Sequence, residues 1–138
     1  LQNSTLDELL QYEQLWVTTT EFMDSDTQKI LSAYVKAGGH LIMYPVIPTL
    51  DLYLNPCTIL RDELKIEISK SASPNKVNAF GIEDLFTIFK DKQIFTDNNS
   101  DVVAITETDE VCGIRKILPR LVLLLDIPAM NIYIYLKK

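Results

Sequence analysis

The segment from Ser25 to Pro48 combines the hydrophobic pattern of a helix with that of a buried strand. Its apolar residues recur at the spacing of one helix face, at Ile30, Leu31, Tyr34 and Val35. We expect Ser25 and Gln28 to form a capping box at the start of this helix and Gly38-Gly39 to end it. Leu41–Tyr44 follows without polar alternation, which predicts a strand covered on both faces.

Two further elements are expected before this helix. The run Gln14–Thr20 is rich in β-branched and aromatic residues and predicts a strand that leads directly into the helix. Strand, helix and second strand form a βαβ unit, for which a right-handed crossover is expected. A short helix with acidic residues in its first turn is predicted to begin at Ser4 or Thr5 and to end near Tyr12.

The pattern after Pro48 predicts shorter elements. Asn55-Pro56 indicates the start of a helix that ends near Lys65. Residues 66–69 and 77–80 predict an antiparallel pair of strands outside the parallel core. Residues 82–89 fit either a helix or a strand, because so short an apolar run has no decisive period.

The last third of the chain predicts a hairpin and a buried strand. Residues 102–106 and 111–117 are expected to pair across a polar turn. Leu121–Leu125 reads as one more buried strand, and residues 126–138 fit both a strand and a helix. We take this tail as a helix, because Pro128 suits a first helical turn.

These elements predict a single α/β domain over residues 1–138. The expected architecture is a three-layer sandwich around a mainly parallel sheet, with an antiparallel hairpin near the C-terminus. Four strands form the expected parallel core, at Leu15–Thr20, Leu41–Tyr44, Val102–Thr106 and Leu121–Leu125. The chain begins at Leu1 without an initiator methionine or a signal-peptide pattern, so we expect a piece of a larger multidomain chain. No compartment can be assigned, although the cytoplasm is favoured.

The charge balance removes two classes of partner. The chain has 13 Lys and Arg against 19 Asp and Glu, which gives a net charge of −6 at pH 7. Nucleic acids and anionic membranes require a clustered excess of cations, so neither is expected as a partner. Cys57 and Cys112 lie far apart without metal-ligand spacing, and both are expected to be small core residues rather than a disulfide or a metal site.

The turn after the first strand is the place where a doubly wound fold would bind a nucleotide. Residues 18–24 read TTTEFMD and contain no glycine-rich phosphate loop. Glu21 and Asp24 would repel a pyrophosphate. We therefore expect no cofactor.

Single side chains with reactive groups do not form a catalytic set in the sequence. His40 is the only histidine, and we expect it at the amino-terminal edge of the sheet, away from the carboxyl ends where such folds hold their sites. Cys57 is predicted at a helix start, which favours the thiolate, but no base is placed beside it. Trp16 would stack on a sugar if exposed, yet its strand neighbours favour a core position. Asp51 is suited to capping a loop or facing the carboxyl edge, and it receives no assigned role.

Acidic groups occur at four places, Asp24/Asp26, Asp62/Glu63, Glu83/Asp84 and Glu107/Asp109/Glu110. Paired carboxylates serve general acid–base catalysis. Each of these groups, however, is predicted in a helix turn or a loop, where acids are ordinarily solvated. We therefore assign no catalytic, cofactor-binding or metal-ligating residue.

The stretch from Trp16 to Asp51 resembles the domain that follows the catalytic barrel in bacterial β-galactosidase-type glycoside hydrolases. The shared pattern is a strand, a helix with Gln28 near its start, Tyr34-Val35 before Gly38-Gly39, and an apolar strand followed by proline and Asp51. This β-galactosidase trimerisation domain implies a flavodoxin-like or class I glutamine-amidotransferase-like fold. Class I amidotransferases carry a glycine-flanked cysteine and a later His-Glu pair, and the sequence has neither.

The resemblance implies a non-catalytic accessory or oligomerisation domain of a bacterial glycoside hydrolase. It also implies two partners, a catalytic barrel in the same chain and further copies in a homo-oligomer. The alternative is a free-standing small-ligand-binding or degenerate amidotransferase-like protein, which would have no barrel upstream. Residues 132–136 would place apolar groups on more than one helical face, so we expect self-association through Ile134 or Tyr135.

Overall fold

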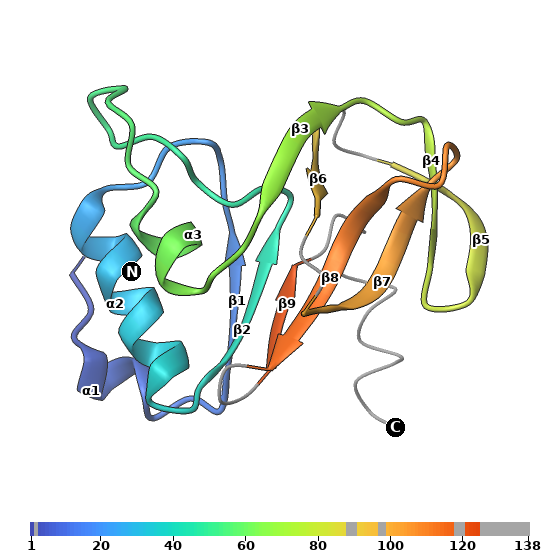
Figure 1. The fold of residues 1–138 in the computed structure, drawn as a ribbon. Helices are drawn as coiled ribbons and strands as arrows, with labels where there is room; N and C mark the ends of the chain where they lie inside the picture. Colours follow the sequence, from blue (N-terminus) through green and yellow to red (C-terminus); the bar gives the residue numbers. More distant parts are fainter. Residues whose placement is uncertain (2, 88–90, 97–98, 118–120, 125–138) are drawn as a thin grey trace.

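A computed structural model describes residues 1, 3–87, 91–96, 99–117 and 121–124 (Figure 1). The first half contains α1 (Leu6–Leu9), β1 (Gln14–Thr18), α2 (Ser25–Lys36), β2 (His40–Tyr44) and α3 (Ile59–Glu63). The second half contains β3 (Ile68–Ala72), β4 (Lys76–Ala79), β5 (Ile82–Phe86), β6 (Lys92–Phe95), β7 (Asp101–Thr106), β8 (Val111–Ile117) and β9 (Leu121–Leu124). The predicted tail helix over residues 126–138, with Ile134 and Tyr135, lies outside the described residues.

A seven-stranded sheet with the order β1-β2-β9-β8-β7-β4-β5 forms the centre of the domain. β1, β2 and β9 run parallel. The other neighbours in this sheet are antiparallel, and β3 and β6 form a separate antiparallel pair. The prediction of a mainly parallel three-layer sandwich is therefore wrong, because antiparallel pairing predominates and helices are few.

Connection length explains this correction. A parallel crossover needs a dozen or more residues, usually in a helix. α2 supplies one between β1 and β2, but only residues 107–110 separate β7 from β8, and only residues 80–81 separate β4 from β5. The short turn at residues 107–110 forces β7 and β8 into a hairpin, so the predicted core strand at Val102–Thr106 is antiparallel to β8. The same strand also pairs antiparallel with β4 on its other side.

Several local predictions are confirmed. Thr5, one of the two expected starts, caps α1 and forms a capping box with Glu8, although the helix ends at Leu9 rather than near Tyr12. The strand, helix and second strand at residues 14–44 form the expected parallel unit, and β7 and β8 form the expected hairpin. The apolar face of α2 packs on the sheet: Leu31, Tyr34 and Val35 share one core with Val17, Leu41 and Met43.

Other elements differ from the predictions. α3 starts only at Ile59, because residues 55–57 pair with the preceding loop and cannot begin a helix. β3 pairs with β6 rather than with β4, so the expected antiparallel pair is wrong. Residues 82–86 form a strand, and the short buried strand β6 was not predicted.

Gly39 is required by close packing at the end of α2. A Cβ atom at Gly39 would lie 2.1 Å from Cζ of Tyr34. The fully buried Tyr34 also donates its hydroxyl to the carbonyl of Tyr12, at 2.9 Å. This arrangement fixes the turn from α2 into β2.

Candidate functional site

Two loops meet at the carboxyl ends of β1 and β2, where an α/β domain ordinarily holds its site. The backbone carbonyl of Glu21 accepts hydrogen bonds from Thr49 N and Leu50 N, each at 3.0 Å. Leu50 in turn accepts from Met23 N at 3.0 Å, and Phe22 and Leu50 form a parallel bridge. Residues 18–24, which occupy the position of the nucleotide-binding turn in doubly wound folds, are thus paired with a neighbouring loop.

Gln28 links three segments beneath these loops. Its side chain is fully buried, and Nε2 donates to the carbonyls of Met23 at 3.0 Å and Cys57 at 3.1 Å. Oε1 accepts from Leu60 N at 3.2 Å. The predicted capping box of Ser25 and Gln28 is therefore wrong, and Gln28 instead satisfies backbone groups around α3.

Asp24 is the residue that caps α2. Its carboxylate accepts from the backbone N–H of Thr27 at 2.9 Å and from the Thr27 hydroxyl at 2.5 Å. These hydrogen bonds, the one from the hydroxyl first, lower the pKa of Asp24 below its ordinary value of 3.8. The carboxylate serves the helix start and is not presented to a ligand.

Asp51 organises an exposed turn. Its Oδ1 accepts from Tyr53 N at 2.8 Å and from Asn55 N at 2.9 Å, and its Oδ2 accepts from Asn55 Nδ2 at 3.2 Å. The hydrogen bond from the Asn55 backbone is the main cause that lowers the pKa of Asp51. Of the two roles considered for Asp51, the structure shows the loop cap.

The single reactive side chains are not brought together. His40 opens β2 opposite Gln14, at the amino-terminal edge as predicted. Cys57 lies in the loop at the other end of β2, before α3 rather than within it, so the predicted helix-start position is wrong. Cys112 is buried in the core as predicted, whereas Cys57 is only half-buried. Trp16 is 36% exposed, so the predicted core position is wrong.

Each acidic group has at least one carboxylate in a structural contact. Asp26 pairs with Lys29, Glu63 with Lys36, Asp84 with Lys76 and Glu110 with Lys70, and Asp62 accepts the Thr58 hydroxyl. These contacts give the carboxylates a role in holding helices, strands and turns. In the part of the chain that the structure describes, no three His, Cys, Asp or Glu side chains are grouped so as to hold a metal ion.

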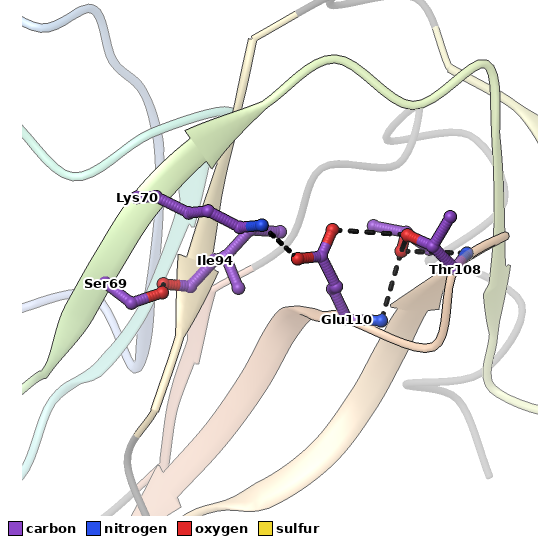
Figure 2. A network of polar contacts seen from close by, with 6 residues as sticks. Ser69, Lys70, Ile94, Thr108 and Glu110 are labelled. Atoms are coloured by element: carbon purple, nitrogen blue, oxygen red, sulfur yellow. Dashed lines mark hydrogen bonds and ion pairs between the residues drawn. The ribbon is translucent and has the colours of Figure 1, made fainter.

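A polar network joins the small sheet to the turn between β7 and β8 (Figure 2). Lys70 of β3 forms an ion pair with Glu110, whose other oxygen accepts from the Thr108 hydroxyl at 3.2 Å. Thr106 Oγ1 accepts from Thr108 N at 3.2 Å and from Glu110 N at 3.1 Å. The Lys70 contact is the main cause that lowers the pKa of Glu110. The network ties the two sheets together.

One surface hollow of about 560 Å³ lies between β4, β5 and β7. Apolar residues line most of it, and Arg115 and Asp101 form an ion pair at its margin, with Nη2 to Oδ2 at 2.7 Å. Its described lining includes no Cys, His or Ser, and its two acidic residues are Glu83 and Asp101, of which Asp101 is paired with Arg115. Among the described helices, none has the length and apolar character needed to cross a membrane.

The model of one protein family, described as GLMA-like, second domain, matches residues 1–102. The chain belongs to this family. A β-1,2-glucosyltransferase of Ignavibacterium album is 53% identical to the GLMA-like domain over 116 residues, which are 84% of this chain and 16% of the relative. An exo-β-D-glucosaminidase of Pyrococcus horikoshii is 46% identical over 71 residues, which are 51% of this chain and 9% of the relative.

The GLMA-like domain shares its fold with part of a solved glycoside hydrolase. Gan42B, a GH42 β-galactosidase of G. stearothermophilus, superposes with a TM-score of 0.75 at 14% sequence identity, over 94% of this chain and 21% of that chain. The expected relationship to accessory domains of glycoside hydrolases is confirmed. None of these three relatives is described as a glutamine amidotransferase, and that part of the resemblance is not confirmed.

Proposed function

We propose that this GLMA-like domain is the non-catalytic accessory domain of a larger glycoside hydrolase and supports a catalytic domain in the same polypeptide. The observation that carries the proposal is the match to a second domain, together with the small share of each relative that the chain spans, 16% and 9%. Domains of this size have their own core and can be combined in longer chains.

The contacts of the described residues favour a non-catalytic role. The carboxyl-end loops use Asp24 and Asp51 to hold backbone groups, and Gln28 is committed to three more. Cys57 and His40 lie at opposite ends of β2, so they do not form a nucleophile and base pair. The hydrogen bonds of Asp24, Asp51 and Gln28 therefore stabilise the fold and need no catalytic role to account for them.

A second candidate concerns the reaction of the catalytic domain. The relative with 53% identity over 84% of this chain is named a β-1,2-glucosyltransferase, which favours transfer of glucose over hydrolysis. We further propose, from the family resemblance, that the domain contributes to a homo-oligomer and that the host is bacterial. The catalytic reaction does not alter the accessory role proposed for residues 1–138.

The complete open reading frame that encodes this chain tests the proposal. We expect it to contain a catalytic domain, and the purified polypeptide to hydrolyse aryl β-glycosides or to transfer glucose to a β-linked acceptor. We expect Cys57→Ala and His40→Ala to leave its kcat unchanged, and residues 1–138 alone to have no activity. Hydrolysis of glutamine or of a glycoside by residues 1–138, abolished by either substitution, would contradict the proposal.

A further inference from the structure

The turn at residues 51–55 presents apolar side chains to solvent at the carboxyl ends of β1 and β2. Leu52, Tyr53 and Leu54 are 54%, 85% and 65% exposed, and we call these three residues the tip. Phe22, 42% exposed, lies at the base of the turn, where it bridges to Leu50. Figure 1 shows this turn projecting from the domain, beyond the start of α2 and away from the sheet. Consecutive exposed apolar side chains are unusual on a free surface and mark interaction sites.

The tip is held in one conformation before any partner binds. Asp51 accepts three hydrogen bonds from Tyr53 and Asn55, and Asp51 N donates to the Asn55 carbonyl at 2.9 Å. Below it, Cys57 N donates to Thr49 O at 2.8 Å. A preformed loop loses little conformational entropy on binding, so its apolar contacts translate more fully into affinity. Tyrosine is enriched among the residues that anchor interfaces, and the two leucines beside Tyr53 add apolar contact area.

The charge around the tip restricts its partner. The two loops at this end carry Glu21, Asp24 and Asp51, and neither residues 1–28 nor residues 37–60 contain a lysine or an arginine. Two copies meeting tip to tip would bring these acids together, and like charges opposed across an interface are costly. This charge favours a complementary surface that is apolar, edged by Lys or Arg, and different from a second copy of the tip.

We propose that the tip inserts into an apolar recess, edged by lysine or arginine, on the catalytic domain of the same polypeptide. This inference rests on the proposed function, because it requires that catalytic domain. In the curated relatives, 84% or more of the chain lies outside the matched region, so a large additional surface is available to cover the tip. Tyr53 fills the recess with its ring, and its hydroxyl remains able to bond at the rim.

Photo-cross-linking in the complete polypeptide tests the contact. Tyr53 is replaced by p-benzoylphenylalanine, the protein is irradiated, and the joined peptides are identified by mass spectrometry. Phe86→p-benzoylphenylalanine is the matched control, because Phe86 is 73% exposed on β5, an edge strand at the far end of the sheet. We expect the Tyr53 variant to cross-link to a peptide of the catalytic domain that contains Lys or Arg, and the Phe86 variant not to do so.

Salt and charge reversal provide a second readout. Raising ionic strength screens exposed charges, so the cross-link yield at Tyr53 should fall with added NaCl. Glu21→Lys should lower the yield at low salt, because it places a cation beside the cationic rim. A yield that neither salt nor Glu21→Lys changes would overturn the cationic rim.

Three outcomes separate this inference from the proposed function. An active polypeptide in which the Tyr53 variant forms no cross-link, or cross-links as readily as the Phe86 variant, overturns the inference alone. Cross-links that join residues 1–138 of two copies also overturn it, in favour of a homotypic contact. A reading frame without a catalytic domain overturns the proposed function and the inference together.

Discussion

At the scale of single residues, Gln28 shows how one side chain can hold several segments together. Polar groups that are buried must be hydrogen-bonded, and its amide meets this condition with two carbonyls and one N–H. The sequence suggested a capping box because glutamine three residues after a serine has that spacing. In the structure the N-cap is Asp24 rather than Ser25, so the helix begins one residue earlier than the capping box requires. Gln28 is among the buried residues of this helix.

We expect Gln28→Met to lower the free energy of unfolding by about 2–4 kcal/mol, because it removes the partner of the buried Leu60 N–H and of the partly buried carbonyls of Met23 and Cys57. Urea unfolding followed by circular dichroism measures this change. Gln11→Met is the control, since Gln11 is exposed and its replacement should change stability by less than about 0.5 kcal/mol. Equal effects of the two substitutions would show that Gln28 does not clamp these segments.

At the scale of secondary-structure elements, the helix ends could be predicted from the sequence better than the pairing of the strands. The start of α1 near Thr5 and the end of α2 at the glycines could be predicted, because helix caps depend on residues that are neighbours in the sequence. β6 was not readable, since Lys92 and Gln93 resemble a polar loop although both are buried. Gln93 bonds Ile47 N at 2.7 Å and Ile47 O at 2.8 Å, a partner 46 residues away that no local pattern indicates.

The cap of α2 gives a pH-dependent prediction. The folded-state pKa of Asp24 is lowered from 3.8, so its stabilising contribution is present above about pH 4–5 and is lost as pH falls through the folded pKa. Asp24→Asn keeps one acceptor oxygen for Thr27 but loses the second acceptor and the charge, and we expect it to lower stability by up to about 1 kcal/mol at pH 7.

As pH falls below the folded-state pKa of Asp24, wild type and Asp24→Asn should converge, as measured by urea unfolding over a pH series. Asp109→Asn serves as the control, because Asp109 lies exposed in the turn between β7 and β8 and caps no helix. A difference between wild type and Asp24→Asn that persists unchanged at low pH would assign the effect to shape rather than charge.

At the scale of the whole molecule, the sheet joins a parallel half to an antiparallel half. β9 pairs in parallel with β2 through Leu41↔Val122, and antiparallel with β8 through Lys116↔Val122. The strands themselves could be predicted from apolar runs, but their order could not, since a run such as Leu121–Leu125 is compatible with either pairing. The candidate site shows the same limit. Asp51 and Cys57 could be singled out in the sequence, but the pairing of residues 49–50 with the loop at residues 19–24, and the bond from Gln28 to Cys57, could not.

A proline substitution in β9 tests whether this strand, which lies between β2 and β8, connects the two halves of the sheet. Leu123→Pro removes an N–H from a strand with neighbours on both sides, and we expect loss of the cooperative unfolding transition in differential scanning calorimetry. Glu83→Pro makes the same change in β5, the edge strand, and should lower the melting temperature much less. If the two variants melt alike, β9 does not connect the two halves of the sheet.

The position of β9 also has a consequence for synthesis on the ribosome. Until residues 121–124 leave the exit tunnel, β2 and β8 each lack the neighbour that the finished sheet gives them. An unpaired strand edge is a template for association with another chain. The nascent polypeptide must therefore keep the edges of β2 and β8 apart from other chains until nearly the whole domain has emerged, so its folding is late rather than progressive, and slow translation through this region would lengthen its need for a chaperone.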